Sequence, residues 1–159
     1  MRIMVIYDSA YGNTEEIAKA VAEGLKDKGE VSVFKVDNVR PGDIKDIDLL
    51  IVGSPTRVFS PTRAIVGFIR AIPEGALEGT RIATFDTRFS FRDVRSRLMY
   101  NLMIMFGYAA RPLTRKLVRK GGECIIKPEG FYVEGYRGPL KDDEVERASR
   151  WAEQIGEKL

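Results

Sequence analysis

Short runs of consecutive apolar residues constrain the fold of this chain more than any other feature. Arg2–Tyr7 (RIMVIY) and Asp48–Ser54 (DLLIVGS) lack the alternation of a strand that keeps one face in water. Strands that are apolar on both faces need helices on both sides, as in a parallel sheet. The chain therefore predicts an α/β fold with buried parallel strands.

The segments between these runs have the periodicity of helices. Asn13–Lys28 places Ile17, Val21 and Leu25 on one face, and Gly29 ends it. The other predicted strands are Glu30–Val36 at an edge, Arg81–Phe85 and Glu123–Lys127, and the other predicted helices are Pro61–Ile72, Arg92–Phe106, Pro112–Lys120 and Asp142–Leu159. Alternating strands and helices with right-handed crossovers predict a doubly wound, three-layer sandwich with a five-stranded parallel sheet.

Length and composition exclude several kinds of chemistry. A chain of 159 residues is of the size of one domain, which we expect to span residues 1–159. The absence of His excludes a Ser-His-Asp triad, and the single Cys124 excludes an internal disulfide and a CxxC pair. We therefore expect no metal site, and we expect any redox chemistry to come from a bound cofactor.

Charge and hydropathy suggest a cytoplasmic protein without a membrane span. Asp8 interrupts the N-terminal apolar run, so we expect no secretory signal. The apolar run Leu98–Ala110 is shorter than the roughly 20 residues of a spanning helix. Residues 57–120 contain 13 Lys and Arg but only 4 Asp and Glu, which suits an anionic partner if these residues share one surface.

A loop of small and hydroxyl-bearing residues, Ser9-Ala10-Tyr11-Gly12-Asn13-Thr14, follows the first strand. The N–H groups of a first helical turn lack intrahelical acceptors and the helix dipole favours anions, so this junction suits a phosphate. The loop matches neither a Walker A loop nor GxGxxG, and without Lys or Arg we expect it to bind phosphate through dipoles alone. The alternative is a plain helix cap at Asn13 or Thr14.

Several segments resemble the flavodoxin family, and together they cover nearly the whole chain. Val5–Val21 (VIYDSAYGNTEEIAKAV) is similar to the N-terminal signature of flavodoxins, with an aromatic strand end and Gly-Asn-Thr in the loop. Gly53–Arg57 (GSPTR) resembles the first flavin loop, and Phe85–Arg88 (FDTR) stands where the second flavin loop lies. Gly130–Val133 and Gly138–Leu140 resemble the end of the family's sequences.

The resemblance implies a flavodoxin-like strand order, 2-1-3-4-5, and FMN as the cofactor. The phosphate would lie on loop 9–14 and the isoalloxazine between loops 54–60 and 86–91, at the carboxyl ends of the strands. Phe59 or Phe89 would stack on the ring, and Thr56 and Ser60 would bind its pyrimidine end. The implied cofactor-binding residues are Ser9, Ala10, Tyr11, Gly12, Asn13, Thr14, Ser54, Pro55, Thr56, Arg57, Phe59, Ser60, Asp86, Thr87, Arg88 and Phe89.

The resemblance implies electron transfer between a reduced donor and an acceptor, with a redox partner protein and no catalytic acid or base. Ser54-Pro55-Thr56-Arg57 is also similar to NAD(P)H:quinone reductases of this fold, which leaves an enzyme using NAD(P)H and a quinone or flavin as the alternative. A flavin-free interaction module is the third possibility. Ser54 rather than Asp ends the third strand, which disfavours a receiver domain, and no basic recognition helix indicates nucleic-acid binding.

Leu98–Ala110 (LMYNLMIMFGYAA) contains more apolar surface than one helix face buries. Apolar surface of this kind marks contact sites, so the run predicts a homo-oligomer interface. A buried third helix is the alternative.

The flavin loops contain Arg57, Arg63, Arg88 and Arg92, where electron-transfer flavodoxins typically have carboxylates. Fully reduced flavin is an anion, and nearby guanidinium groups lower its energy. We predict that the potential of the second reduction is less negative than in an acidic flavodoxin. A potentiometric titration that gives a very low second potential would contradict this.

Overall fold

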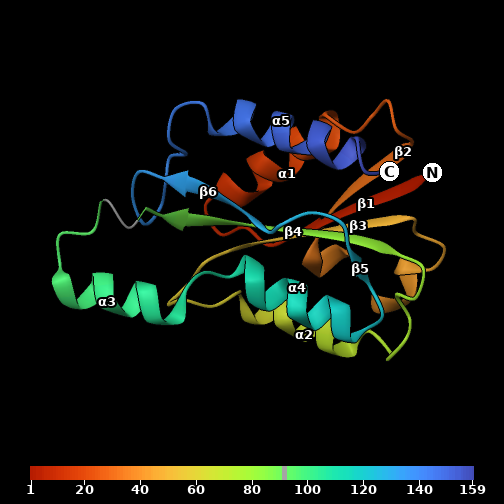
Figure 1. Cartoon of the computed structure of the whole chain (residues 1–159), viewed down its shortest axis with the longest axis horizontal. Coiled ribbons are helices and arrows are strands. Elements are labelled where there is room, and N and C mark those ends of the chain that lie inside the picture. The colour runs from red at the N-terminus through yellow and green to blue at the C-terminus, as the bar shows by residue number, and fades with distance from the viewer. Residues whose placement is uncertain (91–92) are drawn as a thin grey trace.

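Parallel strands form the middle layer of the structure, a computed structural model that describes residues 1–90 and 93–159 (Figure 1). The strand order is β2-β1-β3-β4-β5, with β6 also paired to β4, and this confirms the predicted 2-1-3-4-5 order. The strands are β1 (Arg2–Tyr7), β2 (Glu30–Lys35), β3 (Leu49–Pro55), β4 (Arg81–Phe89), β5 (Glu123–Cys124) and β6 (Glu129–Val133).

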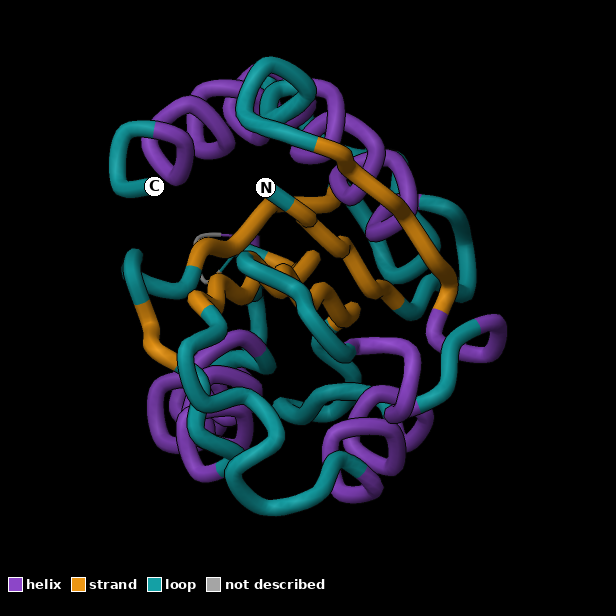
Figure 2. Tube along the Cα trace, turned by 90° about the vertical axis from the view of Figure 1, so that its right-hand side faces the viewer, coloured by secondary structure: helices purple, strands orange, loops and turns teal. Residues whose placement is uncertain are grey.

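Helices cover both faces of the sheet, as Figure 2 shows end-on. The helices α1 (Asn13–Glu23) and α5 (Glu144–Gly156) lie on one face. On the other face lie α2 (Arg63–Ala71) and α4 (Ala110–Arg119), with the short helices η1 (Val36–Asn38) and η2 (Pro41–Ile44). The helix α3 (Arg97–Phe106) extends this second layer toward one end of the molecule (Figure 1).

Two apolar cores result, one on each side of the sheet. Trp151 of α5 is 3% exposed, and its ring packs edge-on against Phe85 and Phe131 with centroids 6.1 Å away in both cases. Edge-to-face aromatic packing stabilises a core beyond the burial of apolar area. This cluster fixes α5 over β4 and β6.

The strands at the site differ from the sequence prediction. The strand β4 continues to Phe89 instead of ending at Phe85, because Glu129–Val133 pairs with its second half. The predicted fifth strand, Glu123–Lys127, ends at Cys124, and the chain resumes pairing with β4 only at Glu129. Asp86 to Phe89 are therefore strand residues rather than loop residues, and β3 extends one residue past its predicted end at Ser54, to Pro55.

Helix boundaries shift for local reasons. The helix α1 ends at Glu23 because Gly24 leaves the helix where it meets α5, and a Cβ on Gly24 would lie 2.8 Å from that of Ala152. The helices α2 and α3 begin later than predicted, after the N-caps Thr62 and Ser96. The part of the predicted third helix at Arg92 lies outside the described residues. Within the described ranges, no helix has the length and apolar character to cross a bilayer.

Gly53 in β3 is a position where packing forbids a side chain. Its register partner is Phe85, and a Cβ on Gly53 would lie 2.1 Å from that ring. We expect Gly53→Ala to lower the free energy of unfolding by about 1–3 kcal/mol, the usual effect of overpacking a core. Urea denaturation followed by circular dichroism measures this.

Gly67, an exposed residue within α2, provides the control, because nothing lies within 4 Å of its Cβ position. Gly67→Ala should raise stability by about 0.5–1 kcal/mol through helix propensity. Equal effects of the two substitutions would contradict the packing argument.

Candidate cofactor-binding site

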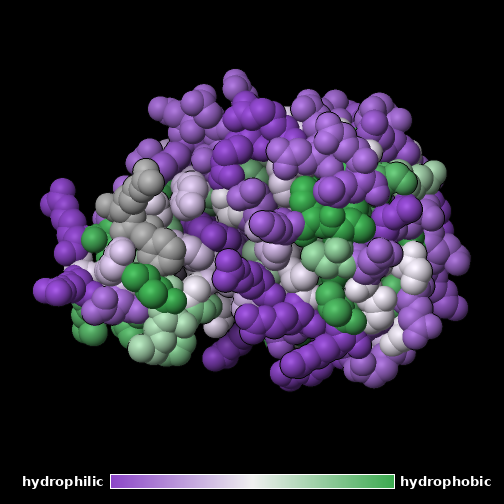
Figure 3. All heavy atoms as spheres, in the orientation of Figure 1, coloured by the Kyte–Doolittle hydropathy of each residue, from purple (hydrophilic) through white to green (hydrophobic). Residues whose placement is uncertain are grey.

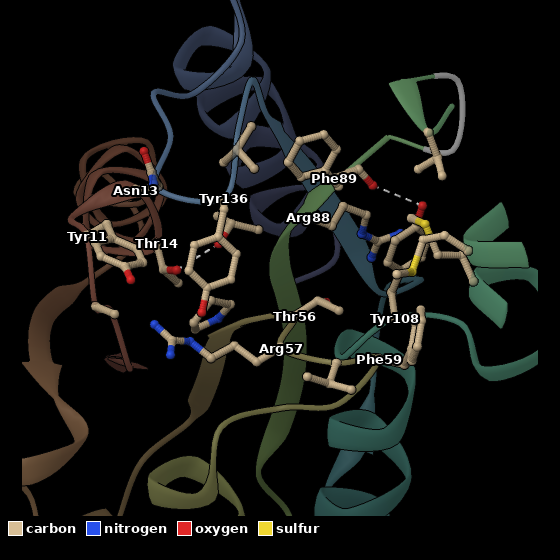
Figure 4. A pocket seen from close by; sticks show the side chains of 18 of the residues that line it. Tyr11, Asn13, Thr14, Thr56, Arg57, Phe59, Arg88, Phe89, Tyr108 and Tyr136 are labelled. Carbon is tan, nitrogen blue, oxygen red and sulfur yellow. Dashed lines mark hydrogen bonds between the residues drawn. The ribbon is translucent and has the colours of Figure 1, made fainter. Parts of the chain in front are cut away.

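A cavity of about 660 Å³ lies at the carboxyl ends of β1, β3 and β4 (Figure 4). This is the size of a cofactor pocket, and it lies where open parallel sheets bind ligands. Of the predicted site residues, those that line it are Ser9, Ala10, Tyr11, Asn13, Thr14, Pro55, Thr56, Arg57, Phe59, Thr87, Arg88 and Phe89. The structure thus brings together the three predicted segments, but Gly12, Ser54, Ser60 and Asp86 do not line the cavity.

The loop at the start of α1 has the geometry of an anion site. Gly12 occupies the N-cap position with φ of 92°, and no side chain caps the helix. The N–H of Gly12 donates to Ser9 Oγ at 3.1 Å, and no atom lies within 4 Å of a Cβ position on Gly12. The first turn of α1 therefore presents N–H groups without intrahelical acceptors beside open space, as a phosphate group requires.

Two hydroxyl groups join this loop to the central strand. Thr14 Oγ1 and Thr87 Oγ1 lie 2.8 Å apart in a buried hydrogen bond between α1 and β4. A buried polar group that keeps its hydrogen-bond partner fixes local geometry at little cost. The bond sets the start of α1 against β4, where both residues line the cavity.

Two arginines from distant loops approach the loop at Tyr11. The guanidinium carbon of Arg57 lies 5.6 Å from the centroid of the Tyr11 ring, and that of Arg137 lies 5.7 Å from it. Arg57 also lies 5.9 Å from the ring of Tyr136, and Figure 4 shows it pointing toward both tyrosines. Asn13 Nδ2 donates to the Arg137 carbonyl at 3.1 Å and ties the two loops together. Dipoles are therefore not the only source of positive potential here, contrary to the sequence expectation.

A tight turn forms part of the pocket wall. The backbones of Arg57 and Ser60 exchange hydrogen bonds of 2.8 and 3.0 Å around Val58 and Phe59, whose φ angles are 44° and 64°. Left-handed backbone at such residues costs about 1 kcal/mol or more each and persists only where the surroundings hold it. The Phe59 ring stacks on Phe106 of α3 with centroids 5.7 Å apart. Ser60 faces a neighbouring hollow instead of the cavity.

Asp86 does not line the cavity, and its contacts support the structure around it. It is fully buried, and both carboxylate oxygens accept from the Arg88 guanidinium, with Nη2 at 2.7 Å from Oδ2. The same oxygen accepts from the Ala110 N–H at 2.7 Å, while Thr56 Oγ1 accepts from the Ala109 N–H at 3.0 Å. Asp86 of β4 and Thr56, which directly follows β3, thus satisfy the first N–H groups of α4, where negative charge is favourable.

The surroundings of Asp86 have opposing effects on the pKa of its carboxyl group. Burial raises the pKa of Asp86, and the Arg88 guanidinium and the Ala110 N–H oppose that rise because they stabilise the carboxylate. Arg88 also lies over the Tyr108 ring, with its guanidinium carbon 3.9 Å from the centroid. The pair thereby connects β4 to the aromatic wall of the cavity.

Nine lining residues were not among those that the sequence predicted, and most of them lie between β4 and α4 or at the end of β6. These lining residues are Val58, Val94, Arg95, Ser96, Met99, Met103, Tyr108, Val133 and Tyr136. Richness in Met and aromatic residues over 98–110 is the signal for this part of the wall, and the sequence analysis interprets it as an oligomer interface. In the structure Met103, Ala109 and Ala110 are buried, and the interface stays a prediction.

The four arginines of the redox prediction have different surroundings. Arg57 lines the cavity, Arg63 borders the neighbouring hollow, and Arg88 is compensated by Asp86. Arg92 lies outside the described residues. Arg95, which the prediction did not include, is a further cation in the cavity wall.

Comparisons with known proteins agree with this geometry. The sequence model of the family described as Flavodoxin matches residues 5–151. A flavodoxin from Clostridium saccharobutylicum is 27% identical, with 100% of this chain and 98% of the relative covered. An NAD(P)H dehydrogenase (quinone) from Archaeoglobus fulgidus is 27% identical, with 98% and 96% covered. The solved structure of oxidised flavodoxin 2 from Bacillus cereus has a TM-score of 0.76 at 21% identity, with both chains fully covered.

The Asp86–Arg88 pair yields a stability prediction. Arg88→Met leaves a carboxylate buried without its cation, and we expect the free energy of unfolding to fall by about 3–5 kcal/mol. The double variant Asp86→Asn, Arg88→Met removes both charges and should lose less than the single variant. Urea denaturation of the three proteins measures this, and a single variant as stable as the original chain would contradict it.

Proposed function

The chain belongs to the flavodoxin family, and we propose that its cavity holds FMN so that it transfers electrons between a reduced donor and an acceptor. Bound FMN supplies the redox chemistry, because it accepts and releases one or two electrons. The observation that supports the proposal most is the meeting of an uncapped α1 N-terminus and an aromatic-lined cavity at the carboxyl end of the sheet. The protein binds the flavin, orients it and sets the electrostatic potential around it.

We assign the phosphate group to the loop from Ser9 to Thr14. The N–H groups of the first turn of α1 and the hydroxyl of Thr14 are its donors. Arg57 and Arg137 add positive charge from two other loops. Within residues 1–90 and 93–159, neither arginine forms an ion pair with a carboxylate, so both charges are available to an anionic ligand.

We assign the isoalloxazine to the apolar part of the cavity. Phe59 and Phe89 lie on its wall, and Tyr108 and the thioether groups of Met99 and Met103 add to it. Aromatic rings and Met side chains favour a flat aromatic ligand and exclude water from it. The Tyr108 hydroxyl donates to the Phe89 carbonyl at 3.1 Å, which fixes the orientation of this wall.

An NAD(P)H-dependent reductase is the second candidate, because the Archaeoglobus fulgidus relative bears the name NAD(P)H dehydrogenase (quinone). In that case Arg57 and Arg95 on the cavity wall would bind the phosphate groups of the nucleotide. Stopped-flow mixing of the FMN-loaded chain with NADPH separates the candidates. Rapid bleaching of the flavin supports a reductase, and its absence leaves a carrier that needs a partner protein.

The phosphate assignment predicts how the chain discriminates between flavins. Riboflavin lacks the phosphate group and so cannot form the charge-assisted hydrogen bonds that FMN forms with this loop. It should therefore bind at least about 100-fold more weakly than FMN. Titration of each flavin with the flavin-free protein, followed by quenching of flavin fluorescence, measures both affinities. Equal binding of the two would remove the phosphate site and favour the flavin-free module.

The two arginines extend the same measurement. Arg57→Met and Arg137→Met should each weaken FMN binding about tenfold and reduce its salt dependence. Riboflavin binding should change little. Arg63→Met is the control, because Arg63 is an exposed residue that borders only the neighbouring hollow. An equal loss of affinity for FMN and for riboflavin would indicate that the arginines contact the ring or support the fold, and that they do not bind the phosphate.

A further inference from the structure

The helix α3 leaves most of its apolar side chains uncovered. The exposed fractions are 71% for Leu98, 59% for Ile104, 73% for Met105 and 58% for Phe106. Of the ten residues of α3 only Met103 is buried. Figure 3 shows hydrophobic side chains gathered at the end of the molecule where Figure 1 places α3.

The uncovered side chains point to more than one side of the helix. They form two runs of three consecutive residues, 98–100 and 104–106. Because an α-helix has about 3.6 residues per turn, three consecutive side chains face three different directions. Met99 faces the cavity and belongs to the site already described. The others fit surroundings that enclose the helix rather than a flat partner that touches one face.

Positive charge surrounds this apolar helix. Residues 94–120 contain seven Arg and Lys and no Asp or Glu. Arg95 and Arg97 precede or begin α3, and Arg111, Arg115 and Arg119 are spaced by four residues along an exposed face of α4. The helix α4 lies beside α3 on the same side of the sheet (Figure 1), and Figure 3 shows hydrophilic side chains over it.

We propose that α3 inserts into the interface of an anionic lipid bilayer and that the arginines around it contact the headgroups. Stable attachment at an interface takes two signals, and an apolar insertion with a basic flank supplies both. The lining residues Met99 and Met103 come from α3, so the cavity wall would lie at the lipid surface. This attachment goes beyond the proposed electron transfer and does not depend on the identity of the donor.

Two other occupants fit the observations less well. A second copy of the chain packed α3 against α3 would bring Arg95 and Arg97 of both copies together, and residues 94–120 contain no carboxylate to pair with them. An acidic protein would satisfy these charges, but it would cover one side of α3 and leave the other apolar side chains in water. Both occupants are outcomes of the experiment.

The test is flotation of the FMN-loaded chain with vesicles of phosphatidylcholine alone or mixed with phosphatidylglycerol. We expect binding to the anionic vesicles at least about tenfold tighter than to the neutral ones, and weaker binding as salt rises. Leu98→Ser with Met105→Ser should reduce binding to anionic vesicles at least about tenfold. Arg111→Gln with Arg115→Gln should reduce the preference for anionic lipid.

Matched controls lie on α5, on the opposite face of the sheet. Val145→Ser and Arg150→Gln remove an exposed apolar side chain and an exposed cation there and should leave vesicle binding unchanged. In a Cys124→Ser background, a spin label on Met105→Cys should gain oxygen accessibility and lose nickel-complex accessibility on anionic vesicles. A label on Val145→Cys should show neither of these changes. This measurement needs no disruption of α3.

Three outcomes would overturn the proposal. The first is no flotation with anionic vesicles. The second is flotation that the Leu98→Ser, Met105→Ser variant retains. The third is a dimer by light scattering that this variant converts to a monomer, with no change of the Met105→Cys label on vesicles, which would assign α3 to a second copy. If the first outcome comes with binding of an acidic plant-type ferredoxin, the surface belongs to a protein partner.

Discussion

Burial of the parallel sheet on both faces is the constraint on which the rest of this structure depends. The strands β1 and β3 are apolar along nearly their whole length, so helices must cover both faces and every crossover must return to the same end. The loops that follow β1, β3 and β4 therefore meet at one edge. That meeting, more than any single residue, creates the cavity.

The central strand β4 connects the packing of the sheet to the site. Its second half pairs with β6, and its side chains alternate between tasks as strand geometry requires. Asp86 and Arg88, two residues apart, share one face and form the buried pair that also holds the start of α4. Thr87, between them, points the other way and bonds Thr14 of α1. The floor of the cavity is thus built from the same polar contacts that position two helices.

The cationic surroundings separate this chain from an acidic electron carrier. Arg57 and Arg137 approach Tyr11 of loop 9–14, the proposed phosphate site, and Arg95 lies in the cavity wall. An anion of either kind, a phosphate group or a reduced flavin ring, is stabilised by such an arrangement. The same sign of charge extends over α4 beside the uncovered apolar helix α3, so one electrostatic character covers the cavity and the adjacent end of the molecule.

The amino-acid pattern predicts the α/β fold class and an anion-binding junction at residues 9–14, whereas the strand order and twelve of the residues that line the cavity are what the resemblance to flavodoxins implies. The fold class and the junction follow from local pattern: apolar runs, helical periodicity, and glycine and hydroxyl residues at a strand end. The burial of Asp86 against Arg88, the approach of Arg137 to loop 9–14 and the contribution of α3 to the cavity wall all depend on tertiary packing. Arg137 and Tyr11 are far apart in the chain, and no local pattern encodes which distant loops meet when a sheet is covered on both faces.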